Sequence, residues 1–522
     1  WGAVVDDGAP FTVDLDPATS VRLVNGYQSW DYAGVRPGDE PGHTWWGGAV
    51  AEPETGRGVA FHALTAVRTA TAFATEPADG RVAVRPVHGR TPEMRPVPGS
   101  WGFQAPLPDP HPQVAAEPYV VGASGNALAA MEDVARAVAD ASGAWRWSGP
   151  PIIGWESWYH YGFSVTPDDV LANGRLMREW FADRPGFRLL QIDDGWQRAY
   201  GDWRPGDGWP ADLGDVAAEI RALGCLPGLW LAPFMVWPGG PGIGGRPDLL
   251  VHGPDGSPRT DPLMGRHGVD ATNPESRDWL RALGATVRGW GFQMVKLDFL
   301  YIGAIEGHRH DPDATGTEAM RAGLGAFVDG LGPDVYVLAC GAPMLPVVGL
   351  CHGNRVGGDL AAPLVWPFPD LVPFPPEEGW RGVAPQARNV AARWWCHRRL
   401  FDVDPDVVMA AGPGDGPPYA TEEARTLAVM AAMAGGPYFM ADDLAALPRE
   451  KRDVLADPVV TDLAWGGGFR PVDLFARPDR APADDLDYFT MPTDLARVWE
   501  RPGVRATFDW AQRRVQVEKT DR

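Results

Sequence analysis

The sequence predicts a multidomain α/β protein with a central (β/α)8 TIM barrel and a β domain on either side of it. Three observations predict this fold: the length of the chain, short apolar runs alternating with helical stretches in its middle, and apolar–polar alternation near both ends. A chain of 522 residues is too long for one ordinary hydrophobic core. We expect an N-terminal β-sandwich at 1–145, the barrel at 146–450 and a small C-terminal β domain at 451–522.

The two β domains are predicted from alternation. The first 145 residues contain short alternating runs such as SVRLVNGY and GRVAVRPV, separated by turn residues, which is typical of antiparallel strands in a sandwich. The tail returns to alternation in RVWERPGVRATFDWAQRRVQVEK and indicates the smaller β domain. Between them, residues 361–380 are dense in proline, so we expect a long ordered loop there.

The barrel is predicted from the alternation of short apolar runs and helical stretches in the middle of the chain. Thr166 and Pro167 open one helical stretch, and Asn273 and Pro274 open another. Eight strand-like runs over roughly 290 residues, with helices between most of them, fit parallel strands joined by right-handed crossovers. An open doubly wound sheet is the alternative, but no GxGxxG or Walker loop follows an early strand. The runs are PIIGW (151–155), FRLLQID (187–193), LPGLWLAP (226–233), MVKLDF (294–299), VYVLAC (335–340), NRVGGD (354–359), residues 401–406 and PYFMADD (437–443).

The composition of the chain limits the classes of partner that it can bind. A net charge of −22 argues against nucleic acid and anionic membranes because both would repel the chain. No run of about 18 uncharged apolar residues suggests a membrane span. Four cysteines without a CxxC pair predict neither a disulfide framework nor a zinc site, and we expect no metal or other cofactor. Without a signal-peptide pattern we expect a cytoplasmic protein, although the chain starts at Trp1 and an upstream segment can precede it. Whether the chain forms a homo-oligomer stays open.

Polar residues at the predicted strand ends carry the functional signal, because the carboxyl ends of barrel strands face the active site. Carboxylates recur there, whereas no histidine is prominent and no serine nucleophile elbow occurs. Each has a plain structural reading: Asp193 and Asp194 could cap a turn, Lys296 and Asp298 could be a buried ion pair, and we interpret 404–406 as a turn. The residues are Trp155, Trp158, Asp193, Asp194, Trp230, Lys296, Asp298, Cys340, Arg355, Asp359, Asp404, Asp406, Asp442 and Asp443.

Paired carboxylates without a metal or histidine are typical of glycoside hydrolases, in which one carboxylate acts as nucleophile and the other as acid/base. Lys296 and Asp298 lie two apart on a strand and share a face, where the lysine would keep the aspartate ionised. The acid partner has to keep a proton near neutrality, so we expect a poorly solvated site for it. Arg355, close to Asp359, could instead bind a sugar hydroxyl.

A series of motifs resembles glycoside hydrolase family 36, the α-galactosidase (melibiase) group. They occur in the family's order and spacing over roughly residues 20–445, and NGYQSW (25–30) resembles its N-terminal motif, with Tyr27 where the family often has Trp. The resemblance implies an N-terminal β-supersandwich, a (β/α)8 barrel and a C-terminal β-sandwich domain. The motifs are GWESWYHYGFSVT, LLQIDDGWQ followed by GDW, PGLWLAPF, MVKLDF, LACGAPMLPVVGL, NRVGGD, FDVDPD and FMADDL.

This resemblance also implies an activity, that of a retaining exo-α-galactosidase acting on α-galactoside oligosaccharides. Asp298 matches the family's nucleophile and Asp359 its acid/base. Asp193 and Asp194 resemble the carboxylates that bind the galactose 4- and 6-hydroxyls. The remaining residues that match the family's substrate pocket are Trp30, Trp158, Trp230, Lys296, Cys340 and Arg355.

Alternatives to this activity stay open. An α-N-acetylgalactosaminidase needs room for a 2-acetamido group, and a galactosyl transferase of the raffinose-synthase type would use the same intermediate but exclude water. A non-catalytic galactoside-binding protein is disfavoured because both candidate carboxylates are present. The proline-dense segment directly follows Asp359, so we expect it to shape the leaving-group side of the pocket.

Overall fold

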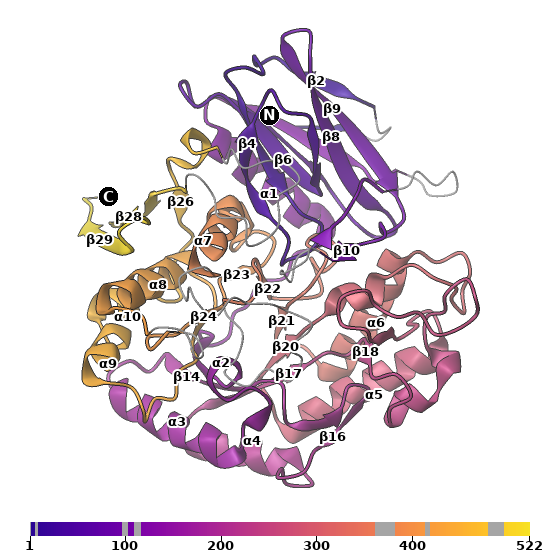
Figure 1. The fold of residues 1–522 in the computed structure, drawn as a ribbon, viewed down its shortest axis with the longest axis vertical. Coiled ribbons are helices and arrows are strands. Elements are labelled where there is room, and N and C mark those ends of the chain that lie inside the picture. The colour runs from indigo at the N-terminus through magenta and orange to yellow at the C-terminus, as the bar shows by residue number, and fades with distance from the viewer. Residues whose placement is uncertain are drawn as a thin grey trace.

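The computed structural model describes residues 2–5, 9–96, 103–108, 116–360, 382–412, 418–478 and 495–521. The proline-dense segment 361–380 lies outside these ranges, so its expected loop stays a prediction. Within them, no helix combines the length and the apolar character that crossing a membrane requires. In Figure 1 the N-terminal sheets stand at the top, the barrel lies below them, and the C-terminal strands lie at the side.

Two antiparallel sheets form the N-terminal region, as its alternating runs predict (Figure 1). Val50 and Phe61 of one sheet are buried together with Phe73 of the other, so the core lies between the two sheets. The six-stranded sheet has the order β1 (Gly2–Val5), β12 (Tyr119–Ser124), β7 (Gly58–Ala63), β6 (Gly47–Ala51), β3 (Val21–Asn25), β4 (Ala33–Pro37). The four-stranded sheet has the order β2 (Phe11–Val13), β9 (Arg81–Gly89), β8 (Ala70–Ala78), β5 (Gly42–Trp45), and a separate pair joins β10 (Arg95–Pro96) to β11 (Phe103–Gln104).

Helix α1 (Ala127–Ser142) packs on β7 and β12 and was not expected in an all-strand region. The side chain of Asn126 accepts a hydrogen bond from the Ala129 N–H and begins the helix. Gly143 ends it in the left-handed conformation, with φ 64°. The alanine-rich sequence between these two caps has high helix propensity, so the signal was present but was outweighed by the surrounding alternation.

The parallel strands form one sheet whose two ends belong to the same chain segment. Its order is β23-β22-β21-β20-β17-β14-β13-β25-β24. Because β23 (Asp402–Asp404) and β24 (Val407–Val408) are consecutive, the sheet is consistent with a (β/α)8 barrel whose seventh strand is broken. The other strands coincide with the predicted apolar runs: β13 (Ile153–Glu156), β14 (Phe187–Ile192), β17 (Leu226–Leu231), β20 (Met294–Leu297), β21 (Tyr336–Ala339), β22 (Gly353–Arg355) and β25 (Tyr438–Met440).

Helices cover the outside of this sheet (Figure 1). The helix α3 (Pro167–Trp180) begins as predicted at Thr166, which forms a capping box with Asp169. The side chain of Asn273 caps α5 (Pro274–Trp290), also as predicted. The remaining helices here are α2 (Trp158–Tyr161), α4 (Leu213–Ala222), α6 (Gly316–Leu331), α7 (Val383–Ala392) and α8 (Thr421–Ala434), and two ribbons pair β15 (Gln197–Ala199) with β16 (Asp202–Pro205) and β18 (Met235–Val236) with β19 (His267–Gly268).

The C-terminal region begins with helices rather than strands. Both α9 (Arg449–Leu455) and α10 (Pro458–Leu463) pack against α8 of the barrel. The β structure expected from about 451 therefore starts only at Arg470, and the three domain boundaries stay predictions. The sheet itself is antiparallel, with the order β26 (Arg470–Pro471), β27 (Val498–Arg501), β28 (Val504–Asp509), β29 (Arg514–Lys519).

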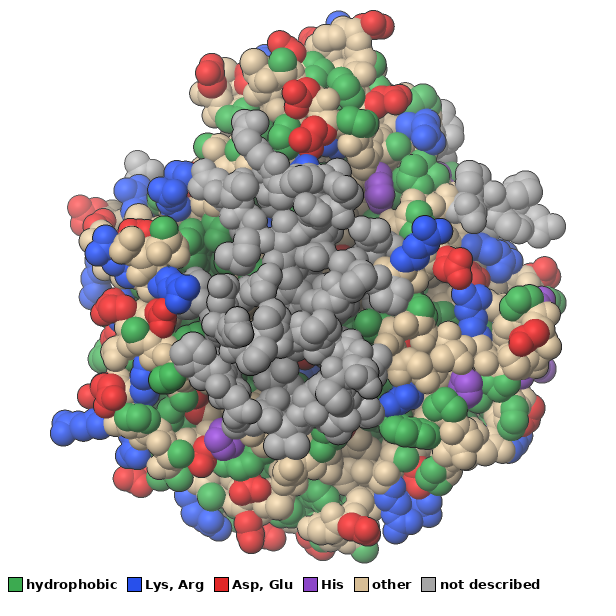
Figure 2. Space-filling view, viewed as in Figure 1, with side chains coloured by type: hydrophobic (Ala, Val, Ile, Leu, Met, Phe, Trp, Pro, Cys, Tyr) green, Lys and Arg blue, Asp and Glu red, His purple; other side chains and the backbone are tan. Residues whose placement is uncertain are grey.

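Charged side chains are mixed on the visible surface of the described residues (Figure 2). Lys and Arg side chains alternate with Asp and Glu around the rim of this face, and no broad basic patch is visible among the coloured atoms. On this face the charged side chains are therefore dispersed rather than gathered in one patch.

Candidate active site

A hollow of about 470 Å³ lies at the carboxyl ends of the barrel strands. Its walls are largely aromatic, and several carboxylates and one lysine face it. In a barrel this end is where substrates bind, because the loops that follow the strands converge there. The lining residues are Trp30, Trp158, Phe163, Asp193, Asp194, Tyr200, Trp230, Met264, Lys296, Asp298, Phe299 and Asp359.

Eight of the ten site residues expected from the sequence line this hollow. The exceptions are Cys340 and Arg355, which are buried beside it. Burial raises the pKa of the Cys340 thiol well above its ordinary value, so this side chain is a neutral apolar group next to the charged ones. The eight residues that do line it are Trp30, Trp158, Asp193, Asp194, Trp230, Lys296, Asp298 and Asp359.

Asp298 is the first residue after β20, and two donors hold its carboxylate. The indole Nε1 of Trp230 donates to Oδ2 at 3.1 Å, and the backbone N–H of Phe299 donates to Oδ1 at 2.7 Å. Phe299 has φ 52°, a left-handed conformation that is costly for a bulky residue and that persists only where the surroundings enforce it. This turn ends the strand and fixes the Asp298 carboxylate in one orientation.

The ion pair of Lys296 differs from the expected one. Its Nζ lies 2.9 Å from Oδ2 of Asp193, and both side chains are buried. The alternative reading of Lys296 and Asp298 as a direct ion pair is wrong for the described residues, because Lys296 is paired with Asp193 and the Asp298 carboxylate accepts from Trp230 and the Phe299 N–H instead. Burial opposes the charge of Lys296, but neighbouring carboxylates, Asp193 foremost, raise its pKa well above the ordinary value.

Asp193 and Asp194 form the end of β14 and have different partners. Asp193 accepts from Lys296 and from Nε2 of Gln191 at 2.6 Å. Asp194 accepts from the Tyr200 hydroxyl at 2.7 Å. Burial raises the pKa of Asp194 to about 7, and the hydrogen bonds from Gln197 and Tyr200 offset only part of this rise. Asp194 can therefore either donate to or accept from a ligand hydroxyl near neutral pH.

Asp359 follows β22 and lies against a buried cluster of charges. The guanidinium of Arg355 contacts Asp359 at 3.2 Å, Asp404 at 2.9 Å and Asp406 at 2.7 Å, and only 1% of this arginine side chain is exposed. The interpretation of 404–406 as a plain turn is therefore wrong, and Arg355 is occupied by carboxylates rather than open to a sugar hydroxyl. Burial first, and the charge of Asp406 second, raise the pKa of Asp359 to about 7.

Comparison with known proteins agrees with this geometry. No family model matches the chain. An α-galactosidase from Thermus thermophilus, solved with p-nitrophenyl α-D-galactopyranoside, shares 25% identity, with 87% of each chain covered and a TM-score of 0.65. The GH36 α-galactosidase AgaA from Geobacillus stearothermophilus shares 16% identity with a TM-score of 0.60, covering 88% of this chain and 64% of its own. A curated relative, the myogenesis-regulating glycosidase of Mus musculus, is 29% identical over 134 residues, which is 24% of this chain and 18% of that protein.

The chain is a glycoside hydrolase, and its fold is similar to that of α-galactosidases. This follows from a shared fold over most of the chain together with a carboxylate-lined hollow at the expected end of the barrel.

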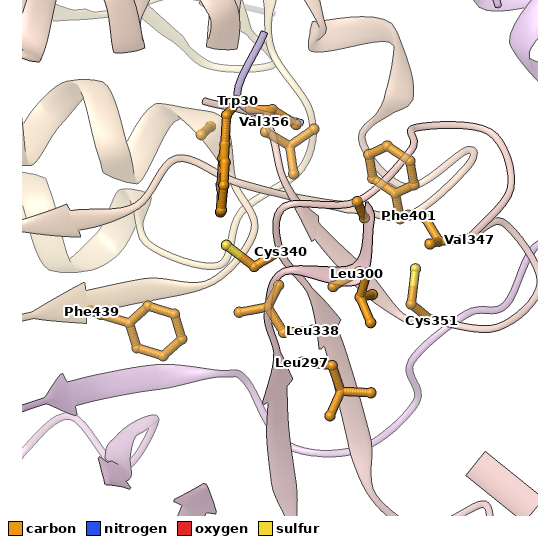
Figure 3. Close-up of a cluster of buried hydrophobic side chains, with 14 of the residues drawn as sticks. Trp30, Leu297, Leu300, Leu338, Cys340, Val347, Cys351, Val356, Phe401 and Phe439 are labelled. Carbon is orange, nitrogen blue, oxygen red and sulfur yellow. The ribbon is translucent and has the colours of Figure 1, made fainter. Parts of the chain in front are cut away.

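In this hydrolase one wall of the hollow comes from the N-terminal domain. Trp30 reaches the barrel mouth, packs edge-on against Phe299 with ring centroids 5.3 Å apart, and stands beside Cys340 in a cluster of buried apolar side chains (Figure 3). Its loop is clamped to the barrel. The guanidinium of Arg393 donates to the carbonyl oxygens of Ser29 at 2.6 Å and Val356 at 2.8 Å.

Four lining residues of the hydrolase were missed from the sequence. Phe299 directly follows Asp298, and Phe163 lies within the GFSVT stretch, so both could have been found from adjacent motifs. Tyr200 follows β15 in a ribbon that folds back over Asp194. Met264 comes from an irregular segment without a local pattern, and only the folded chain reveals it.

Proposed function

We propose that this protein is a retaining exo-α-galactosidase that removes terminal α-linked D-galactose through a β-galactosyl-enzyme intermediate. The observation that carries the proposal is the pair Asp298 and Asp359, two carboxyl groups in one hollow with opposite surroundings. Two hydrogen-bond donors hold the Asp298 carboxylate in one orientation, whereas burial raises the pKa of Asp359 to about 7 and favours a proton on it. Such a division of roles is what double displacement at a glycosidic bond requires.

In the first step Asp298 would attack the anomeric carbon while the bond to the leaving oxygen breaks. Asp359 would give its proton to that oxygen, so that the leaving group departs as a neutral alcohol. The donors from Trp230 and Phe299 keep the Asp298 carboxylate in place for this attack. We expect the two carboxyls to lie about 5–5.5 Å apart, as retention requires.

In the second step the same two residues would exchange tasks. The charge of Asp298 contributes to the raised pKa of Asp359, and that charge is lost when the glycosyl ester forms. Esterification therefore lowers the pKa of Asp359 and favours its action as a base. It would take a proton from water as the water attacks the anomeric carbon, which releases galactose in the α configuration and restores both groups.

Galactose would be recognised by the charged floor and the aromatic walls. Asp193 and Asp194 offer acceptors for hydroxyls, and a sugar that lacks the matching hydroxyl would leave these buried groups unpaired. Trp158 and Trp30 present flat apolar faces that suit the sugar ring. Support for galactosides as the substrate class comes from the neighbour from Thermus thermophilus, solved with p-nitrophenyl α-D-galactopyranoside and with stachyose.

Two measurements test the proposal. Aryl α-glycosides of galactose, N-acetylgalactosamine and glucose and an aryl β-L-arabinopyranoside should be compared, and the highest kcat/KM is expected with galactose. A preference for N-acetylgalactosamine would identify the other enzyme, and turnover of none would favour a binding protein. NMR of the galactoside reaction should show α-galactose first, whereas β-galactose first would exclude the retaining mechanism.

A further inference from the structure

Glu156 is a buried carboxyl that the proposed mechanism does not use. It is the last residue of β13, and 2% of it is exposed. Its Oε2 accepts a hydrogen bond from the backbone N–H of Trp158 at 3.0 Å. Its Oε1 is fully buried and meets no donor among the residues that the structure describes. A buried acceptor without a donor is costly in free energy, so the lack of a donor to this oxygen needs an explanation.

The neighbouring strand β14 has a second buried oxygen without a hydrogen-bond donor among the described residues. Gln191 of β14 is the register partner of Glu156 in the parallel ladder, so both side chains leave the sheet on the same face. The Nε2 of Gln191 donates to Asp193 at 2.6 Å. Its Oε1, like that of Glu156, is buried and has no donor within the described part of the chain. One proton on Glu156 would give both oxygens a partner.

The charges around Glu156 favour that proton. The negative charges of Asp193 at the end of β14 and Asp406 beside β24 favour a proton on Glu156, and the positive charge of Lys296 of β20 opposes it. Burial first and Asp193 second raise the pKa of Glu156 well above its ordinary value. The lysine is already paired with Asp193, so a second anion here would lack a cation of its own.

We propose that Glu156 is a positioning residue that stays protonated during catalysis and donates its proton to Oε1 of Gln191, so that the amide nitrogen of Gln191 is aimed at Asp193. The inference rests on the proposed sugar-binding role of Asp193. An ionised Glu156 would compete with Asp193 for the single amide group, and Gln191 would turn its nitrogen toward either acceptor. The proton thus selects one amide orientation and, through it, the orientation of the Asp193–Lys296 pair.

Infrared difference spectroscopy tests the protonation state without any need for activity. The spectrum of the parent protein minus that of Glu156→Gln at neutral pH should contain the C=O stretch of a protonated carboxyl. The matched control is Glu132→Gln, because Glu132 is a buried glutamate paired with Arg470 and Arg399 and should contribute a carboxylate band instead. A carboxylate band lost from Glu156→Gln would overturn the proposal, even if the protein hydrolysed no galactoside.

Kinetics on p-nitrophenyl α-galactoside test the positioning. Glu156→Gln keeps a neutral donor and should retain kcat/KM within about threefold, whereas Glu156→Leu should raise KM by about tenfold or more because Gln191 loses its fixed orientation. If Glu156→Leu does not fold, Gln191→Leu removes the same link and should show the same rise in KM. A Glu156→Gln protein that folds but loses more than tenfold in kcat/KM would contradict the inference. Absence of turnover in the parent protein would instead contradict the proposed function.

Discussion

Lys296 donates to Asp193 at 2.9 Å, across a strand that separates their own two strands in the sheet. Exposed fractions of 6% and 2% for their side chains mean that water does not screen the pair. A buried ion pair stabilises a fold little compared with apolar side chains, but removing one partner leaves the other charge without compensation. The pair therefore connects the folding of the barrel to the chemistry of the hollow.

The first prediction concerns this pair. Lys296→Met should lower the free energy of unfolding by about 3–5 kcal/mol, because Asp193 would be left as a lone buried charge. Denaturant unfolding followed by tryptophan fluorescence measures it. The double variant Lys296→Met/Asp193→Asn should recover much of the lost stability but none of the activity. Equal stability of Lys296→Met and the parent protein would contradict the assigned pairing.

The second prediction concerns Asp298, the proposed nucleophile. Asp298→Ala should reduce kcat roughly 10⁴-fold or more because no carboxylate remains to form the glycosyl ester. Circular dichroism should show that the fold survives, since Asp298 lies after the end of β20 rather than within it. Retained turnover in this variant would remove Asp298 from the mechanism.

The third prediction concerns Asp359, the proposed acid/base. Because burial raises the pKa of Asp359 to about 7, the fraction that carries a proton falls as the pH rises through that value. We expect kcat/KM for natural galactosides to fall above about pH 7, with a much weaker decline for dinitrophenyl galactoside, whose leaving group needs no proton. Asp359→Ala should likewise spare the dinitrophenyl substrate. Equal losses on both substrates would argue against an acid role.

The fourth prediction links the same group to stability. The folded protein holds protons on Asp359 and Asp194 up to about pH 7, whereas the unfolded chain releases them near the ordinary value of 3.8. Their contribution is fully present below about pH 4 and is lost as the pH rises toward 7, so the free energy of unfolding should fall across this window. Asp359→Asn should remove about 1 kcal/mol per pH unit from that slope. Denaturant unfolding of both proteins at about pH 5, 6 and 7 measures the difference, and parallel slopes would contradict it.

The fifth prediction concerns the clamp on the Trp30 loop. Arg393→Ala removes the guanidinium that binds the carbonyl oxygens of Ser29 and Val356, so Trp30 should lose its fixed position. We expect KM to rise about tenfold while kcat changes less, since Trp30 does not touch the reacting bond. The matched control, Arg398→Ala, removes an arginine that is not part of this clamp. The same KM change in both variants would show a general loss of stability instead.

The carboxylates of the site could be predicted because each follows a predicted strand. Asp193, Asp298 and Asp359 stand at the carboxyl ends of apolar runs, and a barrel brings such ends together. The pairing within that set could not be predicted. Lys296 had a near neighbour in sequence, Asp298, and a true partner 103 positions away, because strand order decides which side chains meet.

Parts of the fold escaped prediction for a similar reason. The helix α1 lies among strands, and α9 and α10 lie where strands were expected. The prediction gave more weight to the alternation around these segments than to their own helix propensity. The local sequence around Asp404 and Asp406 indicates a turn. Their contacts with the buried Arg355, which make them part of a charge cluster, appear only in the folded chain. Such long-range neutralisation leaves no trace in local spacing.

The position of Trp30 has a consequence for how this protein can be rebuilt. Since the N-terminal sandwich supplies a wall of the sugar pocket, a barrel expressed alone would be an enzyme with an open side. Exchanging the sandwich between relatives would transfer part of the specificity with it, provided that the receiving barrel has an arginine that binds the NGYQSW segment as Arg393 does here.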